Sequence, residues 1–310
     1  MPFGIDFIEY FDKPLKLDEI KRINHNRLNT FSILTQSETV PENLEIEYVT
    51  SSEKILNRAR QEVQNRTFSP ENVLNLKKLS YDGKLDITTN LTNYASVVAA
   101  RKIIEPEFTE EESLSVLNKV APVGGTCVIF SEENQYALMG RRSNVLVGEK
   151  YHGFPGFIVG EESNLYKELI EEAEEEAGIR NLNDMEVNLV GVSRGRNHGV
   201  NPNFNYAISS NVLLDQIWRG VWKSGQHDMI SVIQLDEEPY EVYIKENIYG
   251  VKSSANKSKL EVYDKMVDVG MGGMLQVGRF IFGDTWYNNL LGELSESPYN
   301  IKVLEKNFFE

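Results

Sequence analysis

An acidic segment at residues 160–179, "GEESNLYKELIEEAEEEAGI", constrains this chain more than any other stretch, because eight of its twenty residues are glutamate. Apolar residues recur at intervals of four from Leu165 to Ala177. At 3.6 residues per turn this spacing predicts a helix with one buried stripe. Gly178 predicts where that helix ends.

The glutamates are not spread evenly around the polar side of this predicted helix. Four of them gather along one edge of the stripe, within an arc of about 100°. These four are Glu168, Glu172, Glu175 and Glu176. Like charges three and four residues apart destabilise a helix by a few tenths of a kcal/mol per pair. A solvated acidic face is one interpretation. We favour a site for Mg²⁺ or Mn²⁺, because these hard cations prefer carboxylate oxygens.

The residues around the helix add a recognisable pattern. The stretch from Gly156 to Ile179 resembles the signature of the Nudix hydrolases, G-x5-E-x7-R-E-U-x-E-E-x-G-U, where U is a bulky aliphatic residue. Gly156, five residues and then Glu162 match its opening. The matches at its close are Glu172, Ala173, Glu175, Glu176, Gly178 and Ile179. The resemblance is specific over residues 121–179 and extends to about residue 240.

Three positions depart from the signature. Phe157 occupies the place of the second glycine in the usual Pro-Gly-Gly. Eight residues, rather than seven, separate Glu162 from the closing element, so either the loop is one residue longer or Glu161 takes part. Glu171 replaces the arginine that orients the neighbouring carboxylates in the family.

The resemblance implies a fold, an activity and a set of site residues. The fold is an α/β (α+β) architecture, a Nudix-type α/β/α sandwich with a mixed sheet. The activity is Mg²⁺- or Mn²⁺-dependent hydrolysis of a nucleoside diphosphate linked to another group, such as ADP-ribose, NADH or a sugar nucleotide. The implied metal ligands are Gly156, through its carbonyl, Glu162, Glu172, Glu175 and Glu176.

Catalytic roles follow from the same resemblance. Glu175 and Glu176 are the expected catalytic residues. Either Glu176 or a loop glutamate takes the proton from water, and Glu237 and Glu238 are the loop candidates. Glu175→Gln or Glu176→Gln is expected to remove hydrolysis without unfolding the chain.

Two groups of arginines are candidates for binding the phosphates of the substrate. Arg141 and Arg142 end a predicted strand, and alternation sends their side chains to opposite faces, so at most one of them meets phosphate. Arg194 and Arg196 lie in "SRGRNHGVNPNFNY", a loop rich in Gly and Asn that suits a substrate clamp.

The pattern of predicted helices and strands divides the chain into three parts. Residues 1–112 form an N-terminal α+β region of unassigned role, residues 116–250 the Nudix domain, and residues 251–310 a helical extension packed on that domain. In the first part we expect helices at 17–34 and 51–68.

Local patterns give further expectations within these parts. A hairpin with a two-residue turn is expected at 79–87, and strands at 124–131 and 136–142. In the last part helices are expected at 259–270 and 283–294, with "GMGGM" between them as a loop of small residues at a close contact.

Charge and cysteine content limit the partners. The formal net charge is −15 and basic runs are no longer than two residues, so we expect no nucleic-acid or membrane partner. Cys127 is the single cysteine, which excludes an internal disulfide and a cysteine-based zinc cluster. We expect a cytoplasmic protein with a small nucleotide as substrate, and a homodimer is left open.

Other functions stay in view. The main alternative is a catalytically weak or inactive Nudix-like module that binds or senses a nucleotide, which Glu171 and the N-terminal region favour. Processing of RNA ends is disfavoured by the negative charge. An isopentenyl diphosphate isomerase-like role is disfavoured because Cys127 lies on a different strand from the site.

Overall fold

The fold is described by a computed structural model. It covers residues 4–35, 41–64, 72–103, 107–142, 150–195, 202–212, 214–248, 250–253, 260–263, 266–296, 299 and 301–303. For residues 4–9, 142, 250–253, 260–263 and 302–303 it describes the backbone alone.

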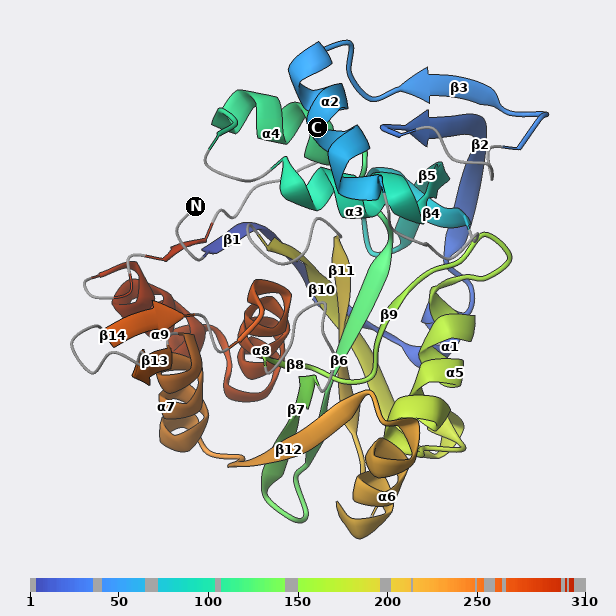
Figure 1. The fold of residues 1–310 in the computed structure, drawn as a ribbon. Coiled ribbons are helices and arrows are strands. Elements are labelled where there is room, and N and C mark those ends of the chain that lie inside the picture. The colour runs from blue at the N-terminus through green and yellow to red at the C-terminus, as the bar shows by residue number, and fades with distance from the viewer. Residues whose placement is uncertain are drawn as a thin grey trace.

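A large mixed sheet runs through the middle of the molecule (Figure 1). In the described part of the chain its order is β12-β7-β6-β11-β10-β1-β15, with two short strands beside β7 and β6. The pairs β11–β6 and β1–β15 are parallel and the remaining neighbours are antiparallel. Its strands are β1 (Gly4–Lys16), β6 (Gly124–Ser131), β7 (Tyr136–Arg142), β8 (Tyr151–His152), β9 (Gly156–Ile158), β10 (Glu186–Gly195), β11 (Asn203–Ser209), β12 (His227–Gln234) and β15 (Lys302–Val303).

Helices cover both faces of this sheet. One face carries α5 (Leu165–Ala177) and α6 (Leu214–Ser224), and the other carries α7 (Glu237–Ile248), α8 (Asp268–Phe282) and α9 (Asp284–Ser295). Alternation along β6 explains the two layers, because Cys127 and Ile129 enter the first core while Val128 and Phe130 enter the second. The expected α/β/α sandwich with a mixed sheet is confirmed.

A second, smaller sheet lies above the first in Figure 1. Its order is β3-β2-β5-β4, and it completes the expected N-terminal α+β region. Its strands are β2 (Asn24–Ile33), β3 (Glu45–Tyr48), β4 (Asn72–Tyr81) and β5 (Leu85–Asn93), and its helices are α2 (Glu53–Val63), α3 (Tyr94–Lys102) and α4 (Glu110–Leu117). Three short elements and a hairpin complete the fold: α1 (Leu17–Ile20), the 3₁₀ helix η1 (Leu182–Asp184), and β13 (Gly250–Ser253) with β14 (Leu260–Tyr263).

The first strand belongs to the larger sheet, not to the N-terminal one. β1 pairs antiparallel with β10 over most of its length. A single apolar cluster also contains Phe31 and Leu76 of the smaller sheet together with Leu165 of α5. The boundary expected near residue 112 stays a prediction, and the two regions share one core.

Two helices expected from the sequence are wrong. Of residues 17–34, only the single turn α1 is helical, and β2 follows it. The ladders with β3 and β5 decide the conformation there, since non-local pairing overrides a loose helical period. Residues 260–263, within the helix expected at 259–270, form β14 and pair with β13.

The segment "GMGGM" at residues 270–274 lies inside α8 and is not the expected loop. The expectation of a close contact is confirmed. A Cβ at Gly270 would lie 2.9 Å from the Cα of His152, and one at Gly273 would lie 3.2 Å from Cγ2 of Thr126. Glycine therefore lets α8 approach the sheet, and this packing outweighs its low helix propensity.

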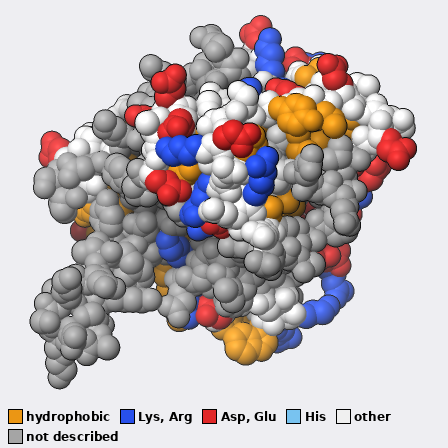
Figure 2. All heavy atoms as spheres, turned by 45° about the horizontal axis from the view of Figure 1, so that its top comes forward, with side chains coloured by type: hydrophobic (Ala, Val, Ile, Leu, Met, Phe, Trp, Pro, Cys, Tyr) orange, Lys and Arg blue, Asp and Glu red, His pale blue; other side chains and the backbone are white. Residues whose placement is uncertain are grey.

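Other local expectations are confirmed. The hairpin at 79–87 joins β4 and β5, although its turn has three residues, 82–84, with Gly83 at φ 66°. On the face formed by the N-terminal region, acidic and basic side chains are interspersed (Figure 2), as in the ion pairs of Lys54 with Glu112 and of Arg58 with Glu107. Among the described helices, none has the length and apolar character that a membrane crossing needs.

Candidate functional site

The acidic helix α5 is defined at both ends by local chemistry. At its start the side chain of Asn164 accepts hydrogen bonds from the backbone N–H groups of Tyr166 and Lys167, each at 3.0 Å. At its end Gly178 adopts φ 68°, and the N–H of Ile179 donates to the carbonyl of Ala173 at 2.9 Å. This left-handed cap is the one that glycine favours, so the expected end of the helix is confirmed.

The buried stripe is also confirmed. Its four members are fully buried against the first core: Leu165, Leu169, Ala173 and Ala177. This packing fixes the rotation of the helix about its own axis. The position of every glutamate around α5 then follows from its place in the sequence.

Two of the signature glutamates lie near the buried strand β6, and one of them also contacts β9 ahead of the helix. Glu176 is fully buried, and its Oε2 accepts a hydrogen bond of 2.9 Å from the backbone N–H of Gly156. Glu172 lies one turn earlier and is half-buried. Burial, and then the negative charges of Glu176 and Glu172, raise the pKa of the Cys127 thiol well above its usual range. Both carboxylates therefore lie near one buried point on β6.

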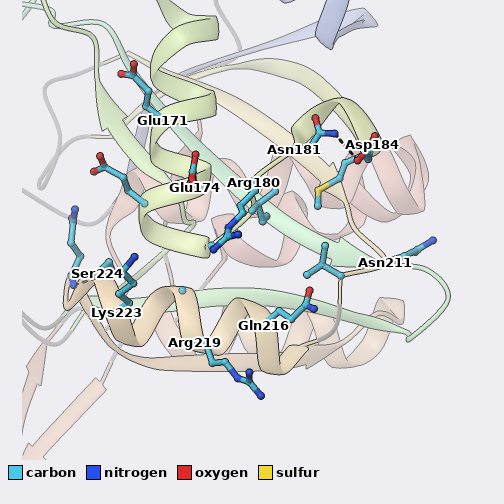
Figure 3. A pocket seen from close by; sticks show the side chains of 17 residues that line it. Glu171, Glu174, Arg180, Asn181, Asp184, Asn211, Gln216, Arg219, Lys223 and Ser224 are labelled. Carbon is cyan, nitrogen blue, oxygen red and sulfur yellow. Dashed lines mark hydrogen bonds between the residues drawn. The ribbon is translucent and has the colours of Figure 1, made fainter.

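Glu175 points elsewhere. It is exposed and lines a cleft of about 1220 Å³ together with Glu171 and Glu174 (Figure 3). The structure thus brings Glu172 and Glu176 together and places Glu175 on another flank of the helix. Within the described ranges, no group of three or more His, Cys, Asp or Glu side chains is arranged to hold a metal ion.

The loop ahead of α5 contains Glu161 and Glu162, the two glutamates between which the longer signature leaves a choice. Glu162 is exposed. Its neighbour Glu161 pairs with Arg27 at 2.5 Å and accepts a hydrogen bond from Asn72 at 2.9 Å. These contacts attach the loop to the smaller sheet. Glu161 therefore has a connecting role here, and the metal-binding role of Glu162 stays a prediction.

The arginines expected to bind phosphate have varied surroundings. Arg141 forms two hydrogen bonds to the carboxylate of Asp228, at 2.8 and 3.0 Å. Arg194 is fully buried, with Nη1 3.5 Å from Oδ1 of Asn118. The side chain of Arg142 and the whole of Arg196 lie outside the described residues. A role in substrate binding stays a prediction for all four.

The two glutamates expected in a loop as general base lie in a helix instead. Glu237 and Glu238 form the exposed first turn of α7. That helix packs on the face of the sheet opposite α5, because their apolar residues enter different cores. Their position directly after a predicted strand suggested a loop. Two consecutive acidic residues are also typical of the first turn of a helix, and this pattern could have predicted α7.

The cleft beside Glu175 contains cations that the sequence did not reveal. It lies between the C-terminal half of α5 and α6, and its basic residues are Arg180, Arg219 and Lys223 (Figure 3). Ile217 and Val221 are four residues apart, and this helical spacing of apolar residues could have predicted α6. Both side chains are buried in the structure. The contact of α6 with α5 is non-local and has no sequence signal.

Comparisons with known proteins give little further identification. No protein-family model matches the chain, and no curated protein sequence matches it. Among solved structures, the chain is similar to a MutT/nudix family protein from Enterococcus faecalis, with 10% sequence identity and a TM-score of 0.33. That similarity covers 63% of this chain and 91% of the other. At this level the functional argument rests on the chain's own residues.

Proposed function

We propose that this protein is a Mg²⁺- or Mn²⁺-dependent hydrolase that cleaves the diphosphate bond of a nucleoside diphosphate linked to another group. The proposal rests on the signature-like segment 156–179 and on one structural observation. The buried carboxylate of Glu176 meets the backbone of Gly156, and Glu172 lies one helical turn before it. A hydrogen bond thus connects the first glycine of the signature-like segment, Gly156, to its last glutamate, Glu176.

The chemistry of these two carboxylates fits a magnesium-type ion. Mg²⁺ is usually held by one or two carboxylates, several waters and the phosphates of the substrate, and a closed cage of protein ligands is not required. Glu172 and Glu176 supply such a pair. A carboxylate has about four lone-pair sites, so the bond from Gly156 can fix the orientation of Glu176 while the group still ligates a cation.

The bound ion would neutralise the diphosphate and lower the pKa of a bound water. The chain's own residues have other tasks. The hydrogen bond from Gly156 holds the Glu176 carboxylate in place, and the close packing of α5 keeps Glu172 beside it. Glu175 is exposed on the cleft, and it or Glu176 accepts the proton of water.

The cleft supports an anionic substrate. Arg180, Arg219 and Lys223 offer charge-assisted hydrogen bonds to phosphate oxygens. The same cleft contains the carboxylates of Glu171, Glu174 and Glu175, which would repel an anion unless a divalent cation accompanied it. A metal-bound diphosphate meets both requirements.

A nucleotide-binding module without turnover is the second candidate, and two observations favour it. Glu171, at the position of the signature arginine, lies 3.9 Å from Lys167 on the outer surface of α5. Glu175 faces the cleft and not the pair formed by Glu172 and Glu176. In this case the protein binds nucleotides and releases no product.

One assay separates the two candidates. The chain is incubated with ADP-ribose, NADH, sugar nucleotides and dinucleoside polyphosphates, with and without Mg²⁺, and phosphate-containing products are measured. The hydrolase proposal predicts turnover of at least one compound only with the metal. It also predicts a loss of about 100-fold or more for Glu176→Gln, against less than about threefold for the control Glu133→Gln, at an exposed position in the turn between β6 and β7. Binding without turnover across the panel would establish the second candidate instead.

A further inference from the structure

Two histidines from distant parts of the sequence meet at one end of the larger sheet. His152 ends β8 and His227 begins β12, and they are 8% and 2% exposed. The Nε2 atoms of their rings lie 3.3 Å apart, and the ring centroids lie 5.0 Å apart. Two buried imidazoles thus face each other through the same ring nitrogen.

The orientation of His152 is fixed by the backbone beside it. Its Nδ1 lies against the carbonyl oxygen of Gly153, so Nδ1 carries the proton and donates it to that carbonyl. In this tautomer Nε2 presents its lone pair, and Nε2 is the atom that faces His227. A histidine that donates Nδ1–H to a backbone carbonyl and presents Nε2 has the arrangement found around metal-ligating histidines.

The separation of the two nitrogens suits an ion between them. Zn–N bonds of 2.0–2.1 Å at a tetrahedral angle place two ligand nitrogens about 3.3 Å apart. The 3.3 Å between the Nε2 atoms of His152 and His227 matches this spacing of two ligands, and without an ion it also allows one ring to donate a hydrogen bond to the other.

Glycines from three elements make room for the rings. A Cβ at Gly140 of β7 would lie 2.5 Å from Cδ2 and 2.9 Å from Nε2 of His227. A Cβ at Gly156 of β9 would lie 3.3 Å from Cε1 of His152, and one at Gly270 of α8 would lie 2.9 Å from its Cα. Phe154 packs against His227, with ring centroids 5.4 Å apart. The pair occupies a space shaped by its neighbours on several sides.

We propose that His152 and His227 form a binding site for a divalent cation of the imidazole-preferring class, Zn²⁺, Co²⁺, Ni²⁺ or Cu²⁺. Imidazole suits these ions, whereas carboxylate suits the Mg²⁺ or Mn²⁺ assigned to Glu172 and Glu176. No group of three or more candidate protein ligands exists among the described residues, so water would have to complete the coordination, as it fills one position of catalytic zinc sites. A bound ion would join the edge strand β12 to β8. This site does not depend on the proposed hydrolase activity.

Cobalt provides a direct test, because its visible absorption reports its ligands. Chelator-treated protein is titrated with Co²⁺ and then with Zn²⁺. We expect tetrahedral-type visible bands that saturate with one Co²⁺ bound at this site per chain, displacement of that ion by Zn²⁺, and a higher melting temperature with Zn²⁺ because the ion binds the folded state. His152→Phe and His227→Phe, which keep an aromatic ring in each position, are expected to weaken Co²⁺ binding at least tenfold.

Control variants separate this site from others. His25→Gln and His198→Gln, at the remaining histidines of the chain, are expected to bind Co²⁺ as the wild type does, and so is Glu176→Gln. Absence of Co²⁺ and Zn²⁺ binding by the wild type, or equal binding by His227→Phe, would overturn the proposal. If both phenylalanine variants fail to fold, a zinc-soaked crystal decides. An anomalous peak within about 2.1 Å of both Nε2 atoms supports the site, and a peak elsewhere or none rejects it.

Discussion

At the scale of single residues, Glu176 and Cys127 explain each other's environment. Glu176 is a fully buried carboxylate held by the N–H of Gly156, and it lies beside the buried thiol of Cys127. Burying a charged carboxylate without a compensating positive charge costs free energy, because the group loses its hydration. A bound cation would compensate the charge of Glu176. The same negative field keeps Cys127 as a neutral thiol.

Cys127 is therefore expected to be unreactive in the folded protein. Iodoacetamide at pH 8 should label it only after denaturation, since the thiolate is the reactive form and burial raises the thiol pKa. The unfolded thiol ionises near its usual pKa, whereas the folded thiol keeps its proton. The free energy of unfolding should therefore fall as pH rises above about 9. Cys127→Ser removes this part of the slope, and rapid labelling of the native chain would contradict the assignment.

At the scale of elements, the close contact between α5 and α6 shapes the cleft. A Cβ at Gly220 of α6 would lie 2.4 Å from the backbone N of Gly178. That neighbour is backbone, which cannot rotate away. The two helices can approach this closely only because glycine occupies both positions.

Gly220→Ala is expected to lower the free energy of unfolding by about 2 kcal/mol, as overpacking of a close contact does. The matched control is Gly292→Ala in α9, where a Cβ would meet nothing within 4 Å. There alanine should stabilise by up to about 1 kcal/mol through helix propensity. Urea unfolding of both variants measures the difference. Equal effects of the two substitutions would mean that the helices do not meet as described.

The elements that the sequence predicted correctly are those specified by local signals. Helix α5 has apolar residues at intervals of four and a glycine at its end, and the strands β6 and β7 are apolar runs joined by a turn. The errors occur where distant contacts decide. Strand β2 looks helical until β3 and β5 pair with it, and α8 contains glycines that only its packing on the sheet explains.

The candidate site divides in the same way. The glutamates of α5 could be assigned because one local pattern specifies them. The orientation of Glu175 toward the cleft depends on α6, and the meeting of His152 with His227 joins residues 75 apart in the chain. Both features depend on contacts between distant segments, and no local sequence pattern predicts them.

At the scale of the whole molecule, β1 connects the two sheets. It pairs with β10 in the larger sheet, while Phe11 is 4% exposed and packs on Tyr81 of the smaller sheet with ring centroids 4.5 Å apart. One apolar cluster includes residues from both regions. The chain should therefore unfold as a single cooperative unit.

Phe11→Ala tests this continuity. We expect the free energy of unfolding to fall by about 3 kcal/mol, with one transition retained, because a buried aromatic side chain is lost from the shared core. Phe280→Ala, at an exposed position of α8, should change it by about 0.5 kcal/mol or less. Calorimetry with two separate transitions, only one of them shifted, would contradict a shared core.

The central claim is that Glu172 and Glu176 hold a divalent cation, and Mn²⁺ binding measured by electron paramagnetic resonance tests it most directly. Wild-type protein should bind Mn²⁺, and more tightly when a nucleoside diphosphate compound is present, since phosphates complete the ligand set. The double substitution Glu172→Gln and Glu176→Gln should weaken binding at least tenfold, while His227→Phe should leave it unchanged. Equal Mn²⁺ affinity in the wild type and the double variant would contradict the account.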